Sequence, residues 1–96
     1  MDKDKEKNFY STRDLYLATT LMTIGFYMTG IDYQVEGEKQ LPVGYFQFEE
    51  NEELIDSLKK YRQGQLFVEP RQFSTNLRSL KAEINNFYKS PNSHLS

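Results

Sequence analysis

Apolar residues recur at helical spacing between residues 70 and 88 and form the clearest pattern in the chain. Five large apolar side chains follow one another in steps of four or three positions: Phe73, Leu77, Leu80, Ile84 and Phe87. Steps of this size keep all five on one face of a helix, so the pattern predicts an amphipathic helix that begins near Pro70. Burying each large apolar side chain stabilises a fold by about 1.5–3 kcal/mol. This helix is therefore expected to supply much of the core.

A second helix is predicted over residues 12–24. Ser11 or Thr12 is a suitable N-cap, Asp14 suits the first turn, and Gly25 stands where a glycine ends many helices. The apolar residues expected to face the interior are Leu15, Leu17, Ala18, Leu21, Met22 and Ile24.

A third helix is predicted over residues 52–62, with Asn51 as its N-cap and Gly64 beyond its end. The acidic residues at its start and the basic residues at its end both interact favourably with the helix dipole. The side expected to be buried consists of Leu54, Ile55, Leu58 and Tyr61.

Between the predicted helices at 12–24 and 52–62, the apolar pattern changes to a period of two. Ile31, Tyr33 and Val35 alternate with polar residues, and a polar link at 36–40 leads to a second run at 43–48. This pattern predicts an antiparallel hairpin. In the second run Phe46 and Phe48 share one face and are expected to point towards the helices. Residues 66–68 are expected to add a third strand or to pack as a link.

These elements predict one compact α+β domain in the order α-β-β-α-(β)-α, with an antiparallel hairpin or small sheet covered by helices. We expect the domain to span residues 9–89. The charged residues 1–8 are expected to form a disordered lead-in, and residues 90–96 a flexible tail.

Length and composition narrow the class of protein. Ninety-six residues make a single domain, and the absence of cysteine excludes disulfides and thiolate metal sites. No signal-peptide core or membrane span is visible in the sequence, which predicts a cytoplasmic protein without a membrane partner. The net charge of −2 means that any contact with nucleic acid needs a local basic patch.

No catalytic or cofactor motif is present. The single histidine, His94, lies in the tail, and the five glycines are scattered rather than gathered in a phosphate-binding loop. The acidic run between residues 49 and 56 lacks the ligand spacing of a calcium loop and is explained by a helix N-terminus. We therefore expect a non-enzymatic protein with no catalytic residue, metal, cofactor or small-molecule substrate.

The C-terminal helix also carries a basic ridge, defined as Arg71, Arg78, Lys81, Asn85 and Lys89. These residues share one side of the helix, roughly opposite the apolar face. Arginine and asparagine at this spacing can contact phosphates and base edges, so the ridge predicts a nucleic-acid partner. The alternative interpretation is an ordinary solvated helix face.

A second candidate surface lies on the 12–24 helix. Its side opposite the apolar residues carries an uncharged set: Thr12, Tyr16, Thr19, Thr20 and Thr23. Solvated helix faces usually carry Lys and Glu, and threonine is a weak helix former. The set predicts either an interface, with a second copy or with an inhibited host or phage protein, or packing against the chain's own hairpin or tail.

Four segments between Phe9 and Tyr88 carry recognisable motifs: Ser11–Ala18, Tyr45–Glu49, Tyr61–Gln65 and Leu77–Lys81. In this order they resemble a small uncharacterised family known as a domain of unknown function in bacteria and phages. The resemblance implies a bacterial or phage setting and a small protein that stands alone. It implies no activity.

Overall fold

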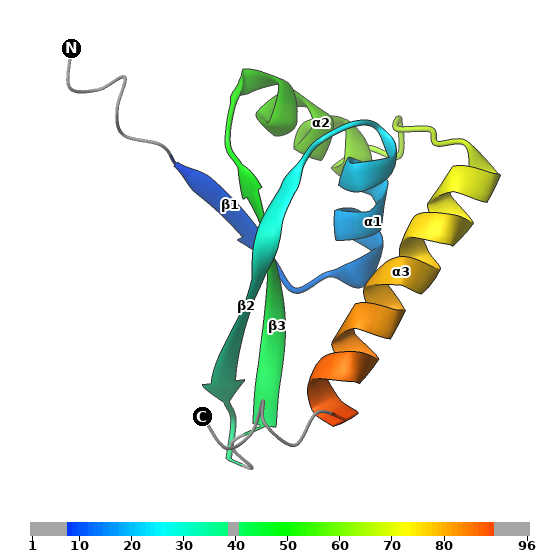
Figure 1. Cartoon of the computed structure of the whole chain (residues 1–96). Coiled ribbons are helices and arrows are strands. Elements are labelled where there is room, and N and C mark those ends of the chain that lie inside the picture. Colours follow the sequence, from blue (N-terminus) through cyan, green and yellow to red (C-terminus); the bar gives the residue numbers. More distant parts are fainter. Residues whose placement is uncertain (1–7, 39–40, 90–96) are drawn as a thin grey trace.

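A computed structural model of the chain describes residues 8–38 and 41–89. Its elements, in chain order, are β1 (Phe9–Thr12), α1 (Leu15–Thr23), β2 (Met28–Glu36), β3 (Leu41–Glu49), α2 (Glu52–Arg62) and α3 (Pro70–Lys89). The three strands form one antiparallel sheet, and α1 lies between this sheet and α3 (Figure 1). The predicted α+β class is confirmed.

The strand order is β1-β3-β2, which places β3 at the centre of the sheet. Phe46 pairs with Thr12 on one side and Ile31 on the other, and Phe48 pairs with Tyr10 and Met28. Paired residues point to the same face, so these strands present one apolar face to the helices. The predicted hairpin is confirmed as β2 and β3.

Of the two alternatives for residues 66–68, a third strand or a link, the structure shows the link. Residues 66–68 form no strand, and Phe67 in this link is 85% exposed. The sheet gains its third strand from β1 instead. A four-residue strand gives almost no periodic signal, and its pairing partners on β3 lie far away in the sequence.

Helix α1 begins later than predicted, because part of its predicted range belongs to β1. Ser11 and Thr12 lie in the strand, so they do not cap the helix. Asp14 is the N-cap: its side chain accepts hydrogen bonds from the backbone N–H of Tyr16 at 3.0 Å and of Leu17 at 3.2 Å. Aspartate is among the best N-cap residues, so the turn between β1 and α1 needs no other cap.

The predicted lead-in and tail lie mostly outside the described residues, which exclude 1–7, 39–40 and 90–96. Asn8 is described and takes part in the fold, because its backbone carbonyl accepts a hydrogen bond of 2.8 Å from the N–H of Glu50.

Helix α2 matches its predicted limits of 52 and 62, and the side chain of Asn51 caps it through a 2.8 Å hydrogen bond from the N–H of Leu54. One residue of its predicted buried side is misplaced, since Ile55 is 49% exposed. Ile55 lies about 100° around the helix from Leu54, whereas Leu58 and Tyr61 stay within about 40° of it. The buried stripe of α2 is therefore narrower than predicted.

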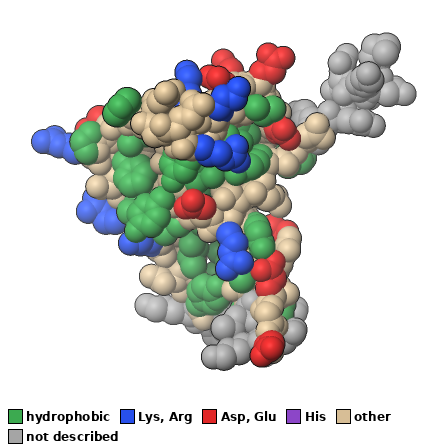
Figure 2. Space-filling model, turned by 180° about the vertical axis from the view of Figure 1, so that it is seen from behind, with side chains coloured by type: hydrophobic (Ala, Val, Ile, Leu, Met, Phe, Trp, Pro, Cys, Tyr) green, Lys and Arg blue, Asp and Glu red, His purple; other side chains and the backbone are tan. Residues whose placement is uncertain are grey.

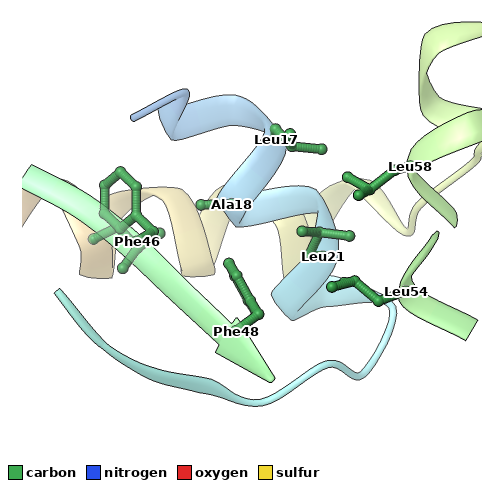
Figure 3. Close-up of a cluster of buried hydrophobic side chains, with 8 residues drawn as sticks. Leu17, Ala18, Leu21, Phe46, Phe48, Leu54 and Leu58 are labelled. Atoms are coloured by element: carbon green, nitrogen blue, oxygen red, sulfur yellow. The ribbon is translucent and has the colours of Figure 1, made fainter. Parts of the chain in front are cut away.

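The core joins all three helices to β3. Its fully buried apolar residues are Leu17, Ala18, Leu21, Phe46, Phe48, Leu54, Leu58 and Leu80. Figure 3 shows α1 at the centre, with Ala18 towards the aromatic rings of β3 and Leu17 and Leu21 towards the leucines of α2. Helix α1 contacts both of the other helices and so links α2 and α3 within the core.

Candidate nucleic-acid interface

The apolar stripe of α3 faces the core, as predicted. Leu80 is 1% exposed, and the other four residues of the stripe are partly buried. The helix packs chiefly against α1 (Figure 1). A helix of 20 residues is about 30 Å long, so α3 extends along one side of the molecule with its opposite face in solvent.

Glu69 fixes the beginning of α3. Its carboxylate accepts hydrogen bonds from the backbone N–H of Arg71 at 3.1 Å and of Gln72 at 2.7 Å. These N–H groups would otherwise lack partners in the first turn of a helix. This cap was not among the predicted ones, although an acidic residue directly before Pro70 is a recognisable signal for it.

Two further contacts hold α3 in place. At its middle, the side-chain amide of Asn76 donates a 3.1 Å hydrogen bond to Thr23 Oγ1 of α1. Near its end, the ring of Phe87 stacks on Tyr33 of β2, and the hydroxyl of Tyr88 donates to the backbone carbonyl of Pro42. The helix is thus attached to other elements at its middle and near its end, while Glu69 caps its beginning.

The basic ridge lies on this exposed face. The side chains of Arg71, Arg78, Lys81 and Asn85 are all exposed, while that of Lys89 lies outside the part of the chain that the structure describes. Arg71 and Asn85 are about 21 Å apart along the helix axis at 1.5 Å per residue. The structure therefore brings four of the five predicted residues onto one surface.

Small side chains separate the basic ones. Ser74, Thr75, Ser79 and Ala82 are exposed and lie on the same half of the helix as Arg78. These residues were not among the predicted site residues, although the same helical angles place them on this face. They leave the helix backbone accessible between the cations, so a partner can approach this face closely.

Carboxylates are directed away from the ridge. Within the described residues, no ion pair joins Arg71, Arg78 or Lys81 to an acidic side chain. Glu69 is engaged as the cap of α3. Glu83 lies about 120° around the helix from Arg71, on the side of Tyr33. Burial, and secondarily the charge of Glu83, raise the pKa of that tyrosine.

Other cations lie near the same face of the molecule. Seen from behind, Lys and Arg side chains gather along α3 and again over α2 (Figure 2). The last turn of α2 supplies Lys59, Lys60 and Arg62, of which Lys60 pairs with Asp56 at 3.2 Å. The positive charge of this protein is therefore concentrated locally, despite its net charge of −2.

The second predicted surface, the Thr/Tyr set, is not a single surface. Thr12 belongs to β1, and Tyr16 is 54% exposed on α1. Thr19 and Thr20 are buried inside the chain, with 0% and 6% exposure, and cannot touch a partner in the folded protein. Thr23 is partly buried and accepts the hydrogen bond from Asn76. Helix α3 covers this side of α1.

The buried threonines satisfy their own hydroxyl groups. Those of Thr19, Thr20 and Thr23 donate to the backbone carbonyls of Leu15, Tyr16 and Thr19, at 2.7, 2.8 and 2.7 Å. Such bonds to the preceding turn allow threonine to be buried in a helix without an unpaired polar atom. The absence of charge on this face is thus a consequence of helix packing.

Among the described residues, the other side chains with a shifted pKa are two tyrosines, Tyr61 and Tyr45. Burial, with a smaller contribution from Asp14, raises the pKa of Tyr61. On the outer face of the sheet, the hydroxyl of Tyr45 donates to Glu36, which also pairs with Arg13 at 3.5 Å, and the hydrogen bond to Glu36 raises the pKa of Tyr45.

A hollow of about 580 Å³ lies between the α1–β2 turn and the start of α2. Tyr27, Glu53 and Asp56 are among the residues that line it. Over the described ranges, no group of three or more His, Cys, Asp or Glu side chains is arranged to hold a metal ion.

Comparison with known proteins places the chain in a family. Residues 7–87 match the family described as "Domain of unknown function (DUF5659)", and the chain belongs to that family. No curated protein and no solved structure matches it. In the described part of the chain, no helix has the length and apolar character needed to cross a membrane.

Proposed function

We propose that this protein is a small, non-enzymatic, nucleic-acid-binding accessory protein that uses the basic ridge of α3. In this proposal it works in the cytoplasm of a bacterium or of a phage-infected cell. The proposal rests on one observation: the exposed face of an anchored helix carries Arg71, Arg78 and Lys81, and no carboxylate among the described residues is paired with them.

Charge and shape both support this function. Phosphate contacts supply most of the affinity of non-specific nucleic-acid binding, and arginine and lysine make them. An ordinary solvated helix face mixes both signs, with Glu and Lys at neighbouring positions. The ridge instead combines cations with small polar residues over about four turns of helix.

Protein interaction through the Thr/Tyr set has less support. Two of its five residues are buried within the chain, and a third is bonded to α3. Only Tyr16 remains a large exposed side chain of that set.

Electrophoretic retardation of labelled DNA and RNA, single- and double-stranded, tests the proposal. At low salt the wild-type protein should retard at least one of these probes. The double variant Arg71→Gln with Arg78→Gln should bind it much more weakly, because each substitution removes a cation that attracts the phosphate backbone.

A charge-matched control separates the ridge from overall charge. Lys59→Gln with Arg62→Gln also removes two exposed cations, but from α2. This variant should retain most of the binding. Equal losses in the two double variants would assign binding to net charge rather than to α3, and no retardation by wild type would refute the proposal.

A further inference from the structure

We infer that the nucleic acid is duplex DNA and that α3 enters its major groove. This inference rests on the proposed function and names the substrate of the same surface. It follows from the steric profile of the exposed face, from the positions of its basic and amide side chains, and from the location of the aromatic residues of α3.

The exposed face is narrow enough to enter a groove. Seen around the helix axis, Arg71, Arg78, Ala82 and Asn85 lie within about 40° of a single line, with Thr75 also on its edge. Three of these five side chains are uncharged and none is bulky and apolar. The major groove of B-form DNA is about 12 Å wide and admits one α-helix with its side chains.

The position of α3 in the molecule allows this approach. Figure 1 shows α3 at the outer edge of the helices, with α1 on its inner side. The contacts that hold it come from Leu80, Asn76 and Phe87, all on the inner half of the helix. The outer half of α3 carries none of these contacts and can face a groove along the basic ridge.

The side chains divide into two roles by angle. Arg78 and Asn85 lie near the middle of the exposed face, where side chains reach the floor of a groove. Arginine there matches the two acceptors of guanine, and asparagine the acceptor and donor of adenine. Lys81 lies about 60° from Arg78 around the helix, at the flank that faces the phosphate backbone.

The positions of the aromatic residues favour duplex DNA over single-stranded DNA or RNA. Proteins that hold single strands stack the bases on exposed aromatic rings. On α3, Phe87 is stacked on Tyr33 and Phe73 belongs to the buried stripe. Tyr88 is 42% exposed, but its hydroxyl is bonded to Pro42 and it lies about 80° around the helix from Arg78, so no ring lies in the middle of the exposed face. Duplex RNA is also excluded by shape, because its major groove is too narrow for a helix.

The beginning of α3 does not bind phosphate in this arrangement. Glu69 occupies the free N–H groups of the first turn and places a carboxylate there. Phosphate contacts must therefore come from side chains, foremost Lys81 at the flank and Arg71 at the very beginning of the helix, about 10 Å along the axis from Arg78. Specificity then depends on the central Arg78 and Asn85.

Fluorescence anisotropy with four labelled probes of equal length tests this inference: duplex DNA, duplex RNA, single-stranded DNA and single-stranded RNA. Wild type should bind duplex DNA most tightly. Ala82→Leu adds bulk at the middle of the exposed face without changing charge, and should lose most of its affinity for duplex DNA. Gln72→Leu, which lies about 100° from Arg71 and also leaves charge unchanged, is the matched control and should bind like wild type.

Selection from a duplex pool with randomised sequence tests the assigned roles. Arg78→Ala should lose a preference for guanine of about tenfold, the usual size for one two-bond base contact, whereas Lys81→Ala should weaken all sequences alike. Thermal unfolding of each variant verifies that its fold is intact.

The outcomes separate the two claims. Equal binding of all four probes, or full duplex binding by Ala82→Leu, would overturn groove insertion and leave the proposed function standing. Tight binding restricted to single strands or to duplex RNA would also overturn it. Binding to none of the probes would refute the proposed function itself.

Discussion

The ring of Tyr33 on β2 lies parallel to the ring of Phe87 on α3, with their centroids 3.6 Å apart and their planes within 2°. This stack joins the end of α3 to the hairpin, far from the contacts with α1. Phe87 also meets Tyr88 edge to face at 5.6 Å. The last turn of the helix, and with it the end of the basic ridge, is held by aromatic contacts.

Phe87→Ala should therefore loosen the end of α3. We expect a loss of about 1–3 kcal/mol in the free energy of unfolding, because a partly buried ring is removed together with its stacking partner's contact. Hydrogen exchange should accelerate in the last two turns of α3 more than in α1. Tyr33→Phe keeps the stacked rings and should change both measurements little; equal effects of the two substitutions would contradict the importance of the stack.

Leu80→Ala should destabilise the whole domain by about 2–5 kcal/mol, because it leaves a cavity where α3 meets the core. Urea denaturation monitored by circular dichroism measures the change. Ser79→Ala, at the exposed neighbouring position, is the control and should stay close to wild type. A wild-type midpoint for Leu80→Ala would remove this residue from the core.

Thr19→Lys distinguishes burial of the threonines from an interface. Thr19 has no exposed surface, so a lysine there forces an unpaired charge between α1 and α3. We expect a loss of about 3 kcal/mol or more, comparable with other unpaired buried charges. Tyr16→Lys, on the exposed side of the same helix, should be nearly neutral. If Thr19→Lys remains as stable as wild type, the packing of α3 over this face is wrong.

Alkaline pH should weaken the fold. The pKa values of Tyr33 and Tyr61 are raised by burial, and the hydrogen bond to Glu36 raises that of Tyr45. Above the ordinary tyrosine pKa of about 10, the unfolded chain has lost protons that the folded protein still holds, so stability falls as pH rises further. Denaturation at several pH values from 8 to 11 measures this loss, and Tyr33→Phe should reduce it. Unchanged stability over that range would contradict the raised values.

The sequence predicted the elements whose signal is local. Helix α2 and the hairpin follow from their caps, alternation and turn residues, and the basic ridge follows from helical spacing alone. Strand β1 could not be found in this way, because its four residues become a strand only by pairing with β3. The same limit applies to Thr19 and Thr20: an uncharged helix face looks alike whether a partner or the chain's own α3 covers it.

The dependence of binding on salt tests the role of the basic ridge most directly. On a probe of non-specific sequence, where Arg71, Arg78 and Lys81 are each expected to neutralise one phosphate, the logarithm of the binding constant should fall with the logarithm of salt concentration with a slope near −3. Each substitution to glutamine should make this slope shallower by about 1, and Lys59→Gln on α2 should leave it unchanged. A slope close to zero in wild type, or one that Arg71→Gln and Arg78→Gln do not alter, would contradict nucleic-acid binding through α3.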